Sequence, residues 1–89
     1  MRFVLDGGSV GSREALHQTL AAGLRLPDWY GGNLDALHDC LTDITEPTEL
    51  VIRGGAAMET ALGSYAAALR RTLADCAAEN TLFSVVWEE

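Results

Sequence analysis

The chain contains three short apolar runs, which predict a small β-sheet. They span Arg2 to Leu5, Glu49 to Arg53 and Thr81 to Trp87, and the last run is rich in β-branched and aromatic residues. None of them alternates strictly between apolar and polar positions, which is typical of strands covered on both faces in a parallel sheet. We therefore expect three parallel strands that are covered on both faces.

A first helix is predicted after Ser12, which is a suitable N-cap. Its apolar face carries Leu16, Leu20 and Leu24 at helical spacing. Pro27 is expected to end this helix, because a proline pushes the preceding residue out of the helical region.

Two further helical stretches follow. Asn33 is the expected N-cap of the second, which runs to about Asp43. The third stretch covers residues 57–78, and Gly63-Ser64 is a point at which it can divide into two helices. The apolar positions expected to face the core are Leu37, Cys40, Leu41 and Ile44 on the second helix and Met58, Leu62, Tyr65, Leu69, Leu73 and Cys76 on the third.

The resulting order, β-α-α-β-α-β, predicts an α/β fold in which a three-stranded parallel sheet packs against helices. The chain has 89 residues, which fits a single domain over 1–89 with a modest core. No internal repeat or linker composition divides it.

The net charge of the chain limits the classes of partner that it can bind. The chain has 13 acidic and 6 basic residues, all of the latter Arg, and a net charge of −7. Such a protein is repelled by nucleic acid and by anionic membranes, so we expect it to bind neither. The first apolar run is too short for a signal peptide, which favours a cytoplasmic protein. Cys40 and Cys76 are then expected to be reduced, buried hydrophobic residues.

A row of carboxylates is the most informative feature. Six acidic residues and no basic one lie between Arg25 and Arg53. On the second helix Asp35, Asp39 and Asp43 are spaced four apart, which places them along one face. Like charges at this spacing repel, and only Asp35, in the first turn, is favoured by the helix dipole. The row is either a solvated face or a binding surface.

The loop before this helix favours a binding surface. Trp29 and Tyr30 follow a proline and precede two glycines, and both aromatics cannot be fully buried on so short a loop. A rigid aromatic side chain beside carboxylates is typical of a surface that binds a cationic partner. His38 lies one turn beyond Asp35 and is either incidental or part of this surface. If it belongs there, its titration makes affinity vary between about pH 5 and 8.

Catalytic and metal sites are less well supported. The sequence has no glycine-rich phosphate loop, nucleophile elbow or Cys–His signature, and Gly7-Gly8 is expected to form a turn. A metal site from Asp35, His38 and Asp39 is conceivable, but His38 and Asp39 are adjacent and no calcium-loop pattern is present. We therefore expect no enzyme activity, no cofactor and no metal.

These residues closely resemble the barstar family of intracellular inhibitors of guanyl-specific bacterial ribonucleases. The similarity is dense from about residue 12 to 43 and weaker beyond. The segments that carry it are Leu16-His17-Gln18-Thr19-Leu20, Leu26-Pro27, Tyr30-Gly31, Asn33-Leu34-Asp35-Ala36-Leu37 and Asp39-Cys40-Leu41-Thr42. The resemblance implies the barstar-like fold and a one-to-one complex with a secreted ribonuclease.

The resemblance also implies the binding residues. The loop and second helix would plug the basic active site, with Asp35 and Asp39 as key carboxylates and Asp39 in the place of a substrate phosphate. Trp29 would stack on the catalytic His of the enzyme. The remaining implied contacts are Gly31, Asn33, Leu34, Thr42 and, late in the last helix, Asp75.

Three departures from the better-known member leave the identity of the partner open. His38 stands where that protein has a Trp, Asp43 replaces a Gly, and Trp29 replaces a Tyr. We include His38 and Asp43 in the expected surface. An alternative function is that of an adaptor or regulatory domain that binds another basic protein, and a small enzyme or metal carrier is a more remote one.

Overall fold

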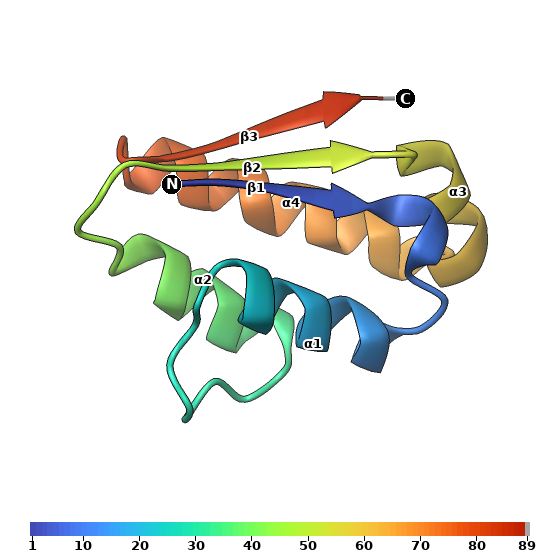
Figure 1. The fold of residues 1–89 in the computed structure, drawn as a ribbon, viewed down its shortest axis with the longest axis horizontal. Helices are drawn as coiled ribbons and strands as arrows, with labels where there is room; N and C mark the ends of the chain where they lie inside the picture. The colour runs from blue at the N-terminus through green and yellow to red at the C-terminus, as the bar shows by residue number, and fades with distance from the viewer. Residues whose placement is uncertain (89) are drawn as a thin grey trace.

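The computed structural model describes residues 1–88, in which a three-stranded parallel sheet lies over a layer of helices (Figure 1). The strand order is β1-β2-β3, so β2 is central. The α/β class and the parallel sheet are as predicted. The elements are β1 (Arg2–Asp6), a 3-10 turn η1 (Gly7–Ser9), α1 (Arg13–Gly23), α2 (Leu34–Thr42), β2 (Thr48–Arg53), α3 (Gly55–Leu62), α4 (Ser64–Glu79) and β3 (Phe83–Glu88).

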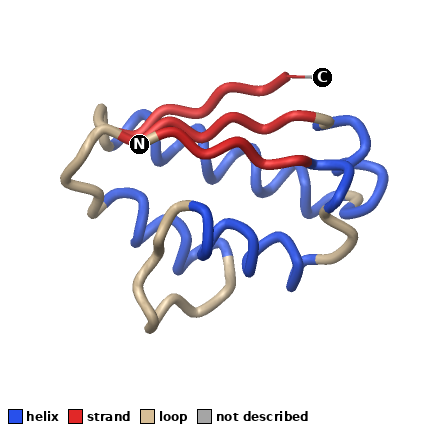
Figure 2. The backbone as a smooth tube through the Cα atoms, in the orientation of Figure 1, coloured by secondary structure: helices blue, strands red, loops and turns tan. Residues whose placement is uncertain are grey.

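Helices cover the sheet on one face only. The expectation that both faces are covered holds for the central strand, where Val51 is 1% exposed, but not for the edge strands, where Val4 is half-buried and Val86 is exposed. Helices α1, α2 and α4 lie on the same side of the strands, and α3 lies at the end where the strands finish (Figures 1 and 2). On the other face the register aligns Val4, Val51 and Val86 in one row. Two ion pairs flank the row, Arg2 with Glu49 at 2.9 Å and Arg53 with Glu88 at 3.0 Å. Val51 is itself buried, so the valines give the two edge strands the same apolar pattern as the buried central strand.

The core lies between the sheet and the helices. The apolar faces predicted for the helical stretches are confirmed, since each contributes buried side chains to one cluster. Its members include Leu5, Leu50, Ile52 and Phe83 from the strands, Leu16 and Leu20 from α1, Leu37 and Leu41 from α2, Met58 from α3, and Leu69, Leu73 and Cys76 from α4. Burial of each such side chain stabilises the fold by about 1.5–3 kcal/mol.

Helix α1 begins as predicted but ends early. The Ser12 hydroxyl accepts a hydrogen bond from the Ala15 N–H at 3.1 Å, which caps the helix. The last helical residue is Gly23, and Arg25 adopts a left-handed conformation with φ 55°. The Leu26 N–H then bonds back to the Ala21 carbonyl at 2.9 Å. This C-terminal motif ends the helix before Pro27 is reached, so the proline is not the stop signal.

The third helical stretch is divided where the sequence allowed it. Gly63 has φ 61° and ψ −137°, a conformation that other residues rarely adopt, and it separates α3 from α4. The last strand begins at Phe83 rather than Thr81. The reason is Asn80, whose side-chain oxygen accepts the Leu82 N–H at 3.0 Å and folds Thr81 and Leu82 into a turn.

Candidate functional site

Helix α2 has one apolar and one acidic face. The side chain of Asn33 accepts a hydrogen bond from the Ala36 N–H at 2.8 Å, which confirms Asn33 as the N-cap. The buried residues of the helix are Leu37, Cys40 and Leu41. The carboxylates predicted to share a face, Asp35, Asp39 and the C-cap residue Asp43, are all exposed. Burial of the apolar positions therefore turns the whole carboxylate row toward solvent.

The loop that leads into α2, residues 24–33, separates its two aromatic residues. It lies on the side of the molecule away from the sheet (Figure 1). Trp29 is 68% exposed, whereas Tyr30 is half-buried and packs against the core. The Tyr30 N–H donates to the Pro27 carbonyl at 2.9 Å. The expectation that both aromatics cannot be buried is confirmed, and Trp29 is the one left on the surface.

His38 lies between α2 and α4. Its Nε2 contacts the Glu79 carboxylate of α4, and its Nδ1 is 3.9 Å from Oδ1 of Asp39. The side chain of His38 is 35% exposed and that of Asp39 is 76% exposed. The hydrogen bond to Glu79 and the nearby negative charges of Glu79 and Asp39 raise the pKa of His38 above its usual 6.5. The histidine therefore gains positive charge more readily than a solvated one.

Glu79 is the residue that sequence reasoning missed. It is 41 positions from His38, and nothing in the local pattern links the two. Asp75, the residue selected in the last helix, is exposed and lies one turn before Glu79, so both carboxylates share a face of α4. The carboxylate that contacts His38 is that of Glu79, and the role of Asp75 in binding stays a prediction.

The other predicted contact residues differ in their environment in the free protein. The Thr42 hydroxyl donates to the backbone carbonyl of His38 at 2.8 Å, so it is used within the helix. Leu34 is half-buried against the core, and Gly31 is exposed. An added Cβ at Gly31 would lie 3.5 Å from the Ala36 side chain, which places this part of the loop against the first turn of α2.

We refer to one group of charged residues as the acidic surface. It comprises Asp35, Asp39 and Asp43 on α2, Asp75 and Glu79 on α4, and His38 between the two helices. Trp29 stands on the loop that enters α2. No basic residue occurs from Leu26 to Ile52, so no nearby Arg in the sequence neutralises the α2 carboxylates. The arrangement attracts cations and offers an aromatic ring at its edge.

Metal-binding clusters and reactive thiols are two kinds of site for which the described residues can be searched. Within residues 1–88 no group of three or more His, Cys, Asp and Glu is arranged to hold a metal ion. Cys40 and Cys76 are free and buried, as predicted. Burial raises the pKa of the Cys76 thiol to about 11, and it also raises that of Cys40, so neither forms a reactive thiolate at neutral pH. No helix in this part of the chain is long and apolar enough to cross a membrane.

Comparisons with known proteins agree with the resemblance found in the sequence. The family model described as "Barstar (barnase inhibitor)" matches residues 1–88. A protein of Bacillus subtilis (strain 168) named "Putative ribonuclease inhibitor YrdF" is 44% identical over 66 residues, which cover 73% of this chain and 72% of that protein. The match extends beyond the segment in which the sequence similarity was dense. The chain therefore belongs to the barstar family, whose members are protein inhibitors rather than enzymes.

Proposed function

We propose that this protein inhibits a guanyl-specific bacterial ribonuclease by covering the enzyme's basic active site with the acidic surface and Trp29. The observation that carries the proposal is the exposed row of Asp35, Asp39 and Asp43 beside an exposed aromatic side chain. Membership of a family of ribonuclease inhibitors supports it. The complex is one-to-one.

The inhibitory mechanism is imitation of phosphate. A ribonuclease binds the RNA backbone through cationic side chains, and those side chains accept carboxylates as partners in place of phosphate oxygens. Asp39, in the middle of the row, takes the central position, with Asp35 and Asp43 on either side. Trp29 stacks on a ring in the active site. The enzyme's cations are then paired and its substrate is excluded.

The flanking residues set the shape of this surface. Asn33 caps α2 and so fixes the direction of the row, and Thr42 holds the last turn. Gly31 and Leu34 allow close approach of the partner to the start of α2, and Asp75 extends the negative charge onto α4. We further propose that the inhibitor acts inside the cell, as an antitoxin that neutralises the ribonuclease before export.

The test is inhibition of RNA cleavage by the wild-type protein and by Asp39→Ala. The protein is titrated into a panel of secreted guanyl-specific ribonucleases, and residual cleavage is measured. Asp39→Ala should weaken binding by well over 1 kcal/mol, because a charge at the centre of an interface is fully desolvated in the complex; the size is that of interface hot spots as a class, the barnase–barstar pair among them.

Glu46→Ala is the matched control. It removes one negative charge from the loop after α2, where Glu46 is exposed. This variant should inhibit nearly as well as the wild type. Unchanged inhibition by Asp39→Ala would remove Asp39 from the interface. Binding of a basic protein without inhibition of any ribonuclease would favour an adaptor or regulatory domain instead.

A further inference from the structure

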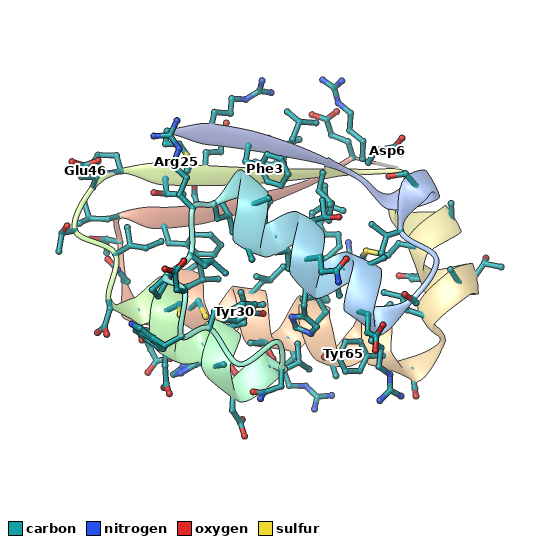
Figure 3. All side chains as sticks on the ribbon, turned by 60° about the horizontal axis from the view of Figure 1, so that its bottom comes forward. Phe3, Asp6, Arg25, Tyr30, Glu46 and Tyr65 are labelled. Carbon is teal, nitrogen blue, oxygen red and sulfur yellow. The ribbon has the colours of Figure 1, made fainter. Side chains whose placement is uncertain are left out.

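A buried histidine joins three elements next to the proposed binding loop. His17 of α1 is 5% exposed, and each of its ring nitrogens meets a tyrosine hydroxyl. Nδ1 contacts Oη of Tyr30, in the loop of residues 24–33, and Nε2 is 2.6 Å from Oη of Tyr65, in α4. Figure 3 shows these two tyrosines reaching the same region of the molecule from their separate elements.

The three side chains form a complete hydrogen-bonded set. Burial lowers the pKa of His17, which keeps the ring neutral near pH 7, and burial raises the pKa values of both tyrosines, which keep their protons. A neutral imidazole has one donor and one acceptor nitrogen. One tyrosine therefore donates to the ring while the other accepts from it, so each ring nitrogen has a hydrogen-bond partner.

Between Pro27 and Asn33, Tyr30 is the side chain that anchors the loop to the core. Every other residue from 27 to 33 is exposed. Its neighbour Trp29 is 68% exposed and contributes nothing to the core. The position of this part of the loop therefore depends on where the Tyr30 side chain is held, and its hydroxyl is held by His17.

We propose that His17 is a positioning residue of the inhibitory surface, which acts by fixing Tyr30 and thereby presetting Trp29 for the ribonuclease. This inference rests on the proposed function. Its physical basis is preorganisation, because a loop that adopts the binding arrangement only part of the time has its affinity reduced to that fraction of the full value. A loop correctly placed a tenth of the time binds about tenfold more weakly.

Two matched variants test the proposal. Tyr30→Phe and Tyr65→Phe each remove one tyrosine hydroxyl that contacts His17. Only Tyr30→Phe releases the loop. With the ribonuclease that the wild type inhibits most strongly, Tyr30→Phe should raise the dissociation constant about tenfold, and Tyr65→Phe less than about twofold. Urea unfolding of both variants separates this effect from lost stability. Equal weakening of binding by the two would overturn the proposal.

His17 is tested directly by a double-mutant cycle. His17→Leu should weaken binding about as much as Tyr30→Phe, and the double variant should bind no more weakly than either, because both changes release the same anchor. A wild-type dissociation constant for a folded His17→Leu variant would contradict the assignment. If His17→Leu does not fold, the comparison of Tyr30→Phe with Tyr65→Phe still tests the proposal.

A measurement on the free protein separates this inference from the proposed function. In a Trp87→Phe background Trp29 is the remaining tryptophan. Tyr30→Phe should change the quenching of Trp29 fluorescence by acrylamide and its anisotropy, and Tyr65→Phe should leave both unchanged. If the wild type inhibits no ribonuclease, the proposed function fails while this experiment still tests loop positioning. Identical Trp29 signals in all variants would refute the role of His17.

Discussion

The two histidines of the chain show how neighbours set the chemistry of a residue. His17 is enclosed by tyrosine hydroxyls, and burial lowers its pKa. His38 lies beside Glu79 and Asp39, and the hydrogen bond to Glu79 raises its pKa. Near neutral pH the first is an uncharged structural group, whereas the second places a titratable cation among the carboxylates proposed to bind a basic partner.

The pKa of His38 predicts a pH dependence of binding. The cations of a basic partner lower the pKa of His38 in the complex, so the complex holds fewer protons than the free protein and affinity rises with pH. Affinity should therefore fall as the pH drops from about 8 to 5, through the raised pKa of His38. The dissociation constant of the wild type is measured across this range beside that of His38→Gln.

His38→Gln is the control because the ribonuclease titrates as well. The difference between the two profiles isolates His38, and Glu79→Gln should move the midpoint of that difference to lower pH, since it removes the largest cause of the raised pKa. If the dissociation constants of the wild type and His38→Gln depend on pH in the same way, protonation of His38 is not coupled to binding.

At the scale of elements, the side chain of Asn80 connects the end of α2 to the turn after α4 through hydrogen bonds. Its side-chain N–H groups lie within hydrogen-bond distance of the backbone carbonyls of Leu41, Thr42 and Ile44, at 3.2, 3.3 and 3.0 Å. The carbonyls of Leu41 and Thr42, in the last turn of α2, have no partner within the helix. One polar side chain therefore fixes the C-terminal end of the helix that carries the carboxylate row.

Removal of the Asn80 side chain should destabilise the protein. Asn80→Ala leaves carbonyls unpaired, and we expect the free energy of unfolding to fall by about 1–3 kcal/mol in urea titrations. Asn80→Asp keeps the oxygen that accepts the Leu82 N–H but has no donor, so it should be at least as destabilising. A wild-type stability for Asn80→Asp would show that the carbonyl contacts contribute nothing.

A close backbone contact predicts a second effect on stability. Gly7 follows β1, and a Cβ built there would lie 2.6 Å from the Gly54 carbonyl oxygen and 2.8 Å from that of Arg53. Gly7→Ala must displace backbone and should lower the free energy of unfolding by about 1–3 kcal/mol. Gly11→Ala is the control, since nothing lies within 4 Å of its Cβ. Equal stability of the two variants would disprove the contact.

For the whole molecule, the net charge of −7 predicts how a complex forms. Attraction between an acidic protein and a basic enzyme accelerates encounter and is screened by salt. The association rate constant with the inhibited ribonuclease should fall steeply between about 0.02 and 0.5 M NaCl, whereas the dissociation rate constant changes little. Stopped-flow mixing measures the first. An association rate that does not depend on salt would contradict electrostatic steering.

The amino-acid sequence by itself determined the elements and the carboxylate row. Helix caps such as Ser12 and Asn33, the apolar faces of the helices and the break at Gly63 depend on contacts within a few residues along the chain, so their patterns predict them. The exposure of Asp35 and Asp39 follows from the same periodicity, because the opposite face of α2 is apolar.

The tertiary structure alone decided which distant residues meet. The contact of His38 with Glu79 spans 41 positions, and that of His17 with Tyr65 spans 48. Such contacts depend on how one element packs against another, which no local pattern encodes. The face of the sheet without helices escaped prediction for the same reason, because Val4, Val51 and Val86 become one row only when the strands pair in register. Sequence placed the charges on a helix, and packing determined their neighbours.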